Sequence, residues 1–262
     1  MQIDEIRALF DQEQRVEVKY PDSRREVTPQ VMRHVDLFDD GQGFILYTRL
    51  DETNAGQVIE EQIEYFTRIG QDFEWKVYDY DTPPDLKERL AARGFVVGEP
   101  EAVMVLDIQE APEVLRAPVG SHIRKVSTAE RMQDVLAILE SVWQGDFTGL
   151  VRDLSRYITE RPEILSVYVA YLDEKPVSCA WIFFHEHSQF ASLWGGSTLP
   201  EYRQLGLYTG LLAARLQEAG HRQVRFLTVD AGPMSRPILE KYAFKMIATS
   251  YACKWPTRQK AE

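Results

Sequence analysis

The stretch LWGGSTLPEYRQLGLYTGLLAARLQEAG, residues 193–220, carries the most informative pattern in this chain. An apolar run leads into a short loop that contains Arg203 and Gly206. After the loop, Leu211, Leu212, Arg215, Leu216 and Ala219 recur at helical spacing, and the pattern stops at Gly220. The stretch therefore predicts a strand, a glycine-containing loop and a helix.

Such a loop is suited to binding a phosphate group. The first N–H groups of a helix have no acceptor within the helix, and its N-terminus carries a partial positive charge. Gly206 lets the backbone approach an anion closely, Arg203 adds a permanent positive charge, and Thr209 could donate a hydroxyl. By itself, Arg-x-x-Gly also fits an ordinary turn, so the choice between a phosphate-binding loop and a turn depends on the elements that surround it.

The order of elements around the loop predicts a mixed α/β domain. A strand at residues 122–126 precedes helices at 129–143 and 150–160, and three apolar runs at 164–172, 177–185 and 189–195 read as an antiparallel meander. The loop and its helix come next, and then a strand at 224–229, a helix at 233–242 and a strand at 244–255.

In this context the segment LPEYRQLGLY resembles the acetyl-CoA signature of the GNAT (N-acetyltransferase) superfamily, Pro-x-x-Arg-x-x-Gly-x-Gly or Ala. Pro200, Arg203 and Gly206 occupy the matching positions, and the later SRPILEKYAF, residues 235–244, resembles the family's helix that ends in Gly-Phe. The resemblance covers about residues 121–256.

The resemblance implies that the chain binds acetyl-CoA as a co-substrate, without a metal. The strand that ends near Thr198 would separate from the strand at 224–229, and the pantetheine arm would pair with free backbone groups of Thr198 and Leu199. The residues expected to hold the pyrophosphate are those of the loop: Arg203, Gln204, Leu205, Gly206, Leu207, Tyr208 and Thr209. Ser235 is a further expected cofactor contact, or it stabilises the start of its helix.

Two residues depart from the family pattern. Tyr208 stands where the signature has a small residue, and its ring either stacks beside the cofactor or packs over the first turn of the helix. Leu239 stands where many relatives have the tyrosine that protonates the leaving thiolate, and leucine has no proton to donate.

Two other side chains are candidates for the acid and base chemistry. Acetyl transfer needs a neutral amine, and an amine of pKa ~10.4 is neutral about once in 10³ molecules at pH 7. Asp230, at the end of the neighbouring strand, is a candidate base, with helix capping as the alternative. Tyr242, one turn after Leu239, is a candidate acid, with core packing as the alternative.

Other chemistry-bearing side chains have simpler readings. Trp143, Trp181 and Trp194 either line an acceptor pocket or fill the core, and we expect core. His185 and His187 could bind a metal, but they have no third ligand nearby, so we expect a solvated turn and no metal site.

The first half resembles the second in pattern. Asp81, Pro84, Leu90 and Phe95 recur as Asp230, Pro233, Leu239 and Phe244, at a constant offset of 149 positions. This offset matches Arg203 with Asn54 and Gly206 with Gln57, behind the acidic pair Asp51 and Glu52, which would repel a pyrophosphate. We therefore expect a degenerate GNAT-like domain at residues 1–110, a linker at 111–120 and a catalytic GNAT domain at 121–262.

Charge and composition limit the partners. The chain has 262 residues and a net charge of −11, with −13 in residues 1–116 and +2 in residues 117–262, which argues against a nucleic-acid partner. No run approaches the roughly 18 apolar residues of a membrane span, and the two cysteines are too few for a disulfide framework. We expect a cytoplasmic protein of open oligomeric state, whose acidic first half would suit a cationic acceptor.

The sequence thus predicts an N-acetyltransferase that moves an acetyl group from acetyl-CoA to a primary amine of a small molecule, peptide or protein by direct attack. The alternative is a non-catalytic acetyl-CoA-binding or interaction module, which the absent tyrosine at position 239 favours. A transferase dependent on aminoacyl-tRNA fits the acidic first half poorly.

Overall fold

The computed structural model describes residues 1–38 and 41–256, which divide by their contacts into two compact units. Unit 1 comprises residues 1–104, 230–237 and 246–262, and unit 2 comprises residues 105–229 and 238–245. No helix in the described ranges is both long and apolar enough to cross a membrane.

The division differs from the predicted domains. It falls inside strand β6 (Glu101–Asp107) rather than at residue 110, and it assigns most of the last strand, β12 (Lys245–Trp255), to unit 1. The expected linker contains helix α4 (Glu113–Arg116), whose Leu115 is fully buried. The predicted boundaries missed this exchange because a strand's own sequence does not specify which neighbour it pairs with.

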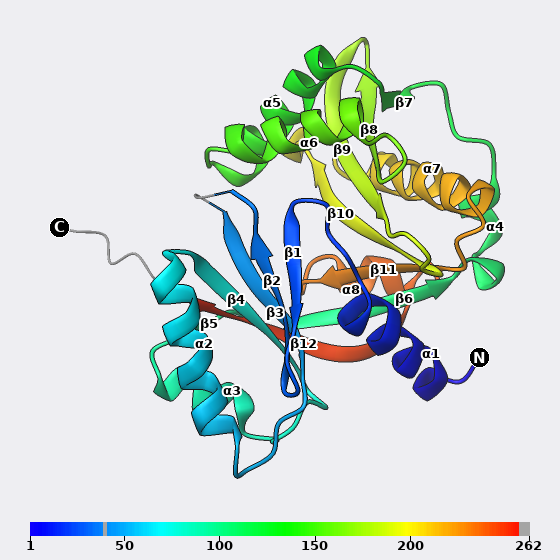
Figure 1. Cartoon of the computed structure of the whole chain (residues 1–262). Coiled ribbons are helices and arrows are strands. Elements are labelled where there is room, and N and C mark those ends of the chain that lie inside the picture. Colours follow the sequence, from blue (N-terminus) through cyan, green and yellow to red (C-terminus); the bar gives the residue numbers. More distant parts are fainter. Residues whose placement is uncertain (39–40, 257–262) are drawn as a thin grey trace. The chain divides into compact units, whose positions relative to one another are not determined.

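Unit 1 is built on a mixed sheet with the strand order β1-β2-β3-β4-β12, and β5 also pairs with β12 (Figure 1). The strands and helices that come from the first half are α1 (Ile3–Phe10), a π-helical segment (Asp11–Val16), β1 (Ser23–Val27), β2 (Val31–Asp36), β3 (Gln42–Thr48), α2 (Ala55–Ile69), β4 (Asp72–Tyr78), α3 (Leu86–Ala92) and β5 (Val96–Val97).

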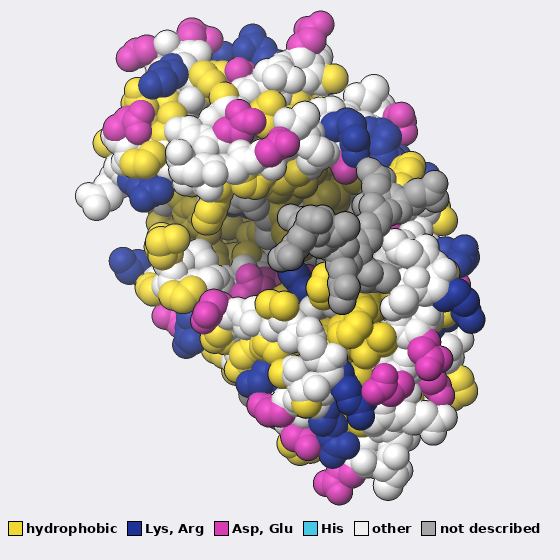
Figure 2. Space-filling view, turned by 90° about the vertical axis from the view of Figure 1, so that its left-hand side faces the viewer, with side chains coloured by type: hydrophobic (Ala, Val, Ile, Leu, Met, Phe, Trp, Pro, Cys, Tyr) yellow, Lys and Arg dark blue, Asp and Glu magenta, His cyan; other side chains and the backbone are white. Residues whose placement is uncertain are grey.

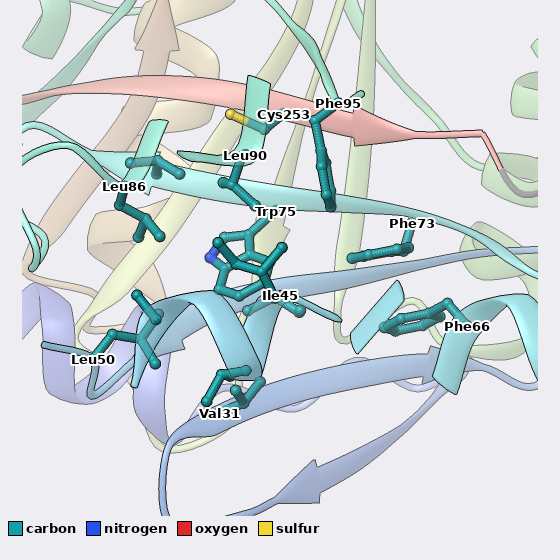
Figure 3. Close-up of a cluster of buried hydrophobic side chains, with 14 of the residues drawn as sticks. Val31, Ile45, Leu50, Phe66, Phe73, Trp75, Leu86, Leu90, Phe95 and Cys253 are labelled. Carbon is teal, nitrogen blue, oxygen red and sulfur yellow. The ribbon is translucent and has the colours of Figure 1, made fainter. Parts of the chain in front are cut away.

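The core of unit 1 lies between its sheet and helices α2 and α3. The apolar residues of α2 fall at helical spacing and face the sheet, where Phe66 stacks on Phe73 with ring centroids 4.2 Å apart. Figure 3 shows these rings in one cluster with Trp75, Leu90 and Cys253, and Cys253 comes from β12. Burial of so much apolar surface is the main force that stabilises the unit.

Unit 2 has the strand order β11-β10-β9-β8-β7, with helices on both faces of the sheet (Figure 1). Helices α5 and α6 pack with Cys179 and Trp181 on one face, and α7 packs with Tyr168 and Ala180 on the other. Its elements are β7 (Ile123–Val126), α5 (Met132–Trp143), α6 (Thr148–Glu160), β8 (Leu165–Leu172), β9 (Lys175–Phe184), β10 (Phe190–Thr198) and α7 (Leu207–His221). It also contains β11 (Phe226–Ala231) up to residue 229 and α8 (Arg236–Glu240) from residue 238.

The predicted repeat is confirmed by the element order. Both halves contain, in the same order, three strands, a helix of 15 residues, a strand, a short helix and a strand. The last strand is β5 in the first half and β12 in the second. Both short helices end in the same way, since Phe95 N–H donates to Leu90 O at 3.2 Å and Phe244 N–H donates to Leu239 O at 3.3 Å. The fold is thus a mixed α/β GNAT fold in the second half, with a GNAT-like repeat in the first.

The constant offset of 149 fails at the helix that follows the loop. Helix α2 begins at Ala55 and α7 at Leu207, so the residue that precedes the helix is Asn54 in one half and Gly206 in the other. Gln57 therefore lies inside α2 and is not the counterpart of Gly206. The loop before the helix comprises residues 49–54 in the first half and residues 199–206 in the second, a difference of two residues that an alignment anchored on the later strand and helix could not reveal.

Candidate functional site

Two parallel strands of unit 2 separate in the middle of its sheet. Strands β10 and β11 are in register from Phe190 and Phe226 to Ser192 and Thr228. Beyond these three pairs, no residue of β10 in the described chain is in register with β11. The last six residues of β10 therefore leave one backbone edge available to a ligand.

A bulge bends β10 where it leaves its neighbour. The register with β9 shifts between Trp194 and Ser197, and Gly195 has a φ of 66°. A Cβ at Gly195 would lie 1.8 Å from the Trp181 ring, so only glycine fits both the backbone conformation and the space.

Side chains bind the carbonyl oxygens of this irregular segment. Arg215 Nη1 donates to Trp194 O at 3.4 Å and to Trp181 O at 3.3 Å, and Ser178 Oγ donates to Ser197 O at 2.8 Å. Arg215 is 2% exposed, and burial lowers the pKa of its guanidinium to about 10. The sequence pattern did include Arg215 among the apolar helix positions, and an arginine in such a stripe is the one signal that could have identified this role.

The predicted phosphate loop lies directly after β10. Gly206 has a φ of 77° and precedes the first residue of α7, and a Cβ there would meet no atom within 4 Å. Because the N–H groups of residues 207–209 lie in the first turn, they have no acceptor within the helix. Arg203 is exposed, with its Nε 3.3 Å from Thr198 O. The loop thus presents N–H donors, a helix N-terminus and a cation to an anion.

Tyr208 packs on the strand rather than only over its own helix. A Cβ at Gly196 would lie 2.9 Å from Tyr208 Cε2, so the ring fits against β10 because residue 196 has no side chain. Burial raises the pKa of Tyr208.

The expectation of free backbone groups holds for neither group of Leu199. Its N–H donates to Val177 O at 3.0 Å, and its carbonyl accepts from Tyr202 N–H at 2.9 Å. That part of the prediction was wrong because the β9 pairing continues one residue beyond the end of β10. Thr198 O accepts a long bond from Arg203 Nε, and Thr198 Oγ1 lies 2.7 Å from Ser178 Oγ.

The structure brings two predicted residues together at the start of α7. Tyr242 OH lies 2.6 Å from Thr209 Oγ1, although 33 positions separate them. Leu239, at the position of the family's tyrosine, is fully buried and belongs to the core. The Tyr242 hydroxyl therefore lies beside the loop, where it could donate a proton.

Asp230 and Ser235 have other partners. The Asp230 carboxylate forms an ion pair with Lys76 Nζ of β4 within unit 1. Burial alone would lower the pKa of Lys76, but the charge of Asp230 and its hydrogen bond, together with Tyr78 and Glu101, outweigh burial and raise that pKa. Ser235 Oγ donates to Gly232 O at 3.2 Å, in the turn before α8.

Of the three tryptophans that we expected in the core, only one is buried. Trp181 is 5% exposed and belongs to the core, whereas Trp143 is 54% and Trp194 is 50% exposed. The core assignment of Trp143 and Trp194 was wrong, because one ends helix α5 and the other lies in the bulge, where packing on both sides is interrupted.

His185 is also less solvated than predicted. Its Nε2 lies 2.7 Å from Ser192 Oγ, and burial lowers the pKa of its imidazole to about 4. His187, by contrast, is exposed in the turn. The described residues contain no group of three potential metal-binding side chains.

In unit 1, a side chain of the protein occupies the space between the two strands that correspond to β10 and β11. Strands β3 and β4 are in register only from Gln42 and Asp72 to Ile45 and Trp75. Beyond that point Arg15 Nε donates to Leu46 O of β3 at 2.8 Å, and its Nη2 donates to both Asp81 carboxylate oxygens.

The N–H groups before α2 are occupied as well. The Asp51 carboxylate accepts from Thr53 N–H at 2.8 Å and from Asn54 N–H at 3.0 Å. The Asp51 carboxylate thus places a negative charge beside the start of α2, where it would repel a phosphate, and Arg15 takes the space between the strands. Both observations give a physical reason for the loss of cofactor binding expected in the first half.

Comparison with known proteins identifies the same architecture. Residues 132–244 match the model of a family described as the acetyltransferase (GNAT) family. No curated protein matches the chain. A GCN5-related N-acetyltransferase from Kribbella flavida is similar over 97% of this chain and 96% of its own, with a TM-score of 0.70 and 15% identity.

Two further solved structures extend over most of the chain. A conserved protein of unknown function from Staphylococcus epidermidis matches over 90% of this chain and 94% of its own, with a TM-score of 0.66 and 15% identity. A tandem GNAT protein from the clavulanic acid biosynthesis pathway matches over 94% and 86%, with a TM-score of 0.61 and 12% identity. At such identities these likenesses establish the fold and not the substrate.

Proposed function

We propose that the second half of this chain, which matches the acetyltransferase (GNAT) family over residues 132–244, transfers an acetyl group from acetyl-CoA to a primary amine. The observation that carries the proposal is the separation of β10 and β11 immediately before a glycine loop at the N-terminus of α7. An anionic cofactor that spans the loop and the free edge of β10 uses both features at once.

Residues 203–209 bind the pyrophosphate in this proposal. The N–H groups of the first turn of α7 donate to the phosphate oxygens, Gly206 keeps the approach open, and Arg203 contributes charge. The side chains that bind the carbonyls of Trp194 and Ser197 keep the bulged part of β10 in place beside the thioester.

The reaction is a direct displacement. The neutral amine attacks the thioester carbonyl carbon, the C–N bond forms, the C–S bond breaks, and the amine loses a proton to solvent. Tyr242 is our candidate for the acid that protonates the departing thiolate, because it has a hydroxyl near the start of α7, whereas the buried Leu239 has no proton to donate. Asp230 is a poor base in this state because its carboxylate is paired with Lys76.

The test combines binding and turnover. Calorimetry with acetyl-CoA measures the cofactor site, and release of free CoA thiol with a panel of primary amines measures transfer. Arg203→Glu places a carboxylate at the loop and should weaken acetyl-CoA binding by at least about 100-fold. Glu201→Gln, in the same loop, is the control. Unchanged affinity in Arg203→Glu would refute the loop assignment.

A second function is favoured by two observations, the buried Leu239 and the ion-paired Asp230. These fit a module that binds acetyl-CoA without turning it over. Tight binding in the calorimeter together with no thiol release for any amine would support the module over the enzyme.

A further inference from the structure

Two large aromatic side chains of unit 2 are exposed near the free edge of β10. Trp143, the last residue of α5, is 54% exposed, and Trp194 of β10 is 50% exposed. In Figure 2, charged side chains of both signs are interspersed with hydrophobic ones over the outer surface of the upper part of the picture. An indole ring that remains half exposed forgoes much of the free energy that its burial would provide.

Both rings lie on the same face of the sheet. Trp194 is directly opposite Trp181, and Ser197 is directly opposite Cys179. Trp181 and Cys179, two residues apart in β9, both belong to the core beneath α5 and α6. Since opposed residues share a face, Trp194 and Ser197 also face the α5 side.

The Trp143 ring is fixed to the strand. Its Nε1–H donates to Ser197 Oγ at 2.9 Å, and Ser197 is 3% exposed. The two tryptophans are therefore anchored at positions 194 and 197 of β10, at most about 10 Å apart along the chain.

Between these anchors lie Gly195 and Gly196, which have no side chains. This segment has no side chain of its own, and the rings of Trp181 and Tyr208 pack against Gly195 and Gly196. It is part of the stretch of β10 that has left β11, where the proposed function puts the thioester.

We propose that Trp143 and Trp194 bind the apolar body of the acceptor, and that the acceptor is a small primary amine on an aromatic or alkyl body. This inference rests on the proposed function. Apolar surroundings disfavour the ammonium form, so they lower the pKa of the bound amine and supply the neutral nucleophile that the paired Asp230 does not generate. An acceptor without an apolar body would leave the two indole faces without a packing partner.

The kinetic test compares amines of similar basicity and different bodies. For the wild-type protein, kcat/KM for 2-phenylethylamine should exceed that for ethylamine by at least about tenfold. Trp194→Ala and Trp143→Ala should each remove most of this ratio, and Ser197→Ala, which frees the Trp143 ring, should reduce it a few-fold. The KM for acetyl-CoA should stay unchanged in Trp143→Ala, whose side chain comes from α5 and not from the proposed cofactor site.

Val96→Ala, which truncates an exposed apolar residue of unit 1 (64% exposed), is the matched control and should keep the wild-type ratio. Equal kcat/KM values for the two amines, or a preference for spermidine that survives both tryptophan substitutions, would overturn the assignment.

A binding measurement separates this inference from the proposed function. The protein has five tryptophans, so 5-fluorotryptophan labelling gives five ¹⁹F resonances, which single Trp→Phe variants assign. Titration with 2-phenylethylamine in the presence of CoA should shift the resonances of Trp143 and Trp194 and leave that of Trp75, 1% exposed, unchanged.

Shifts at both residues without any turnover would support the amine site and contradict the enzyme. Turnover without shifts at Trp143 and Trp194 would support the enzyme and overturn the amine site.

Discussion

Arg15 and Arg215 are both almost fully buried, but the protein satisfies their charges differently. Arg15 is paired with the carboxylates of Asp11 and Asp81, and its guanidinium lies 3.9 Å from the centroid of the Tyr78 ring. Arg215 donates to backbone carbonyls of α7, β9 and β10. The first arginine closes the space between two strands, whereas the second supports the strand that borders the proposed cofactor site.

Replacement of Arg15 should destabilise unit 1 strongly. Arg15→Met leaves the Asp81 carboxyl, whose side chain is 8% exposed, without its cationic partner. Loss of one partner of a buried pair costs about 3–5 kcal/mol. Urea unfolding followed by circular dichroism measures the change, and Arg24→Met, at an exposed ion pair, is the control. A midpoint equal to that of the wild type would show that the buried pairs contribute little.

Tyr242 can be tested as the acid through its hydroxyl alone. Tyr242→Phe should lower kcat by about 10²-fold or more, because the leaving thiolate loses its proton donor, while the KM for acetyl-CoA stays the same. Tyr202→Phe, in the loop before α7, controls for the loss of a hydroxyl. An unchanged kcat would exclude Tyr242 as the donor, provided that chemistry limits the rate.

A single carboxylate of helix α7 accepts hydrogen bonds from two strands of the sheet and from the end of its own helix. Glu218 accepts hydrogen bonds from Lys125 of β7, from Ser166 of β8 and from Arg222 of its own helix end. Burial by itself would raise the pKa of Glu218, but hydrogen bonds from Lys125, Tyr168 and Ser166 outweigh it and lower the pKa to about 2.

This shift predicts a defined pH dependence. The folded pKa lies below the ordinary value of about 4.3, so the stabilisation by Glu218 is fully present above that value and is lost as the pH falls towards 2. Glu218→Gln should therefore destabilise the protein at pH 7 and flatten the dependence of stability on pH between about 4.5 and 2. Unfolding at a series of pH values measures it, with the exposed Glu130→Gln as control. Parallel curves for wild type and Glu218→Gln would contradict the prediction.

The strand and the loop should respond differently to an added methyl group. Gly195→Ala places a Cβ 1.8 Å from the Trp181 ring, so the bulge of β10 must shift, and we expect a cost of about 2–4 kcal/mol with weakened acetyl-CoA binding. In Gly206→Ala the new Cβ has no atom within 4 Å, so we expect a loss of only about 1 kcal/mol of stability, for an alanine held at a φ of 77°. Thermal unfolding measures the stability of the two variants, and calorimetry measures their affinity for acetyl-CoA. Equal losses in Gly195→Ala and Gly206→Ala would contradict the assigned role of the bulge.

At the scale of the whole molecule, the last strand links the predicted second domain to unit 1. Strand β12 pairs with β4 from Ser250 and Tyr78 to Trp255 and Phe73, and its Cys253 is fully buried in the core of unit 1. A fragment of residues 121–262 would expose this apolar strand.

The fragment 121–262, produced alone, should therefore associate or unfold without a cooperative transition. Gel filtration and calorimetry check this, with the full chain as reference. A monomeric fragment with a sharp transition would show that the second half folds independently of β4.

The sequence predicted local structure where local signals are strong. The apolar spacing from Leu211 to Ala219 predicted helix α7, and Pro200, Arg203 and Gly206 located the loop before it. The strands β1 and β2 were not anticipated, because β1 reads SRREV, which is polar on both faces. Such a strand forms because a neighbour pairs with its backbone, and its own side chains do not reveal that.

The sequence by itself therefore determined the repeated order of elements and the loop from Arg203 to Thr209, because these depend on interactions within a few turns of the chain. Only the tertiary structure decided that Asp230 pairs with Lys76, 154 positions away, that Arg15 fills the space between β3 and β4, and that Tyr242 reaches Thr209. The reason is physical: a buried charge or hydroxyl takes the partner that folding brings near it, and spacing along the chain does not specify that partner.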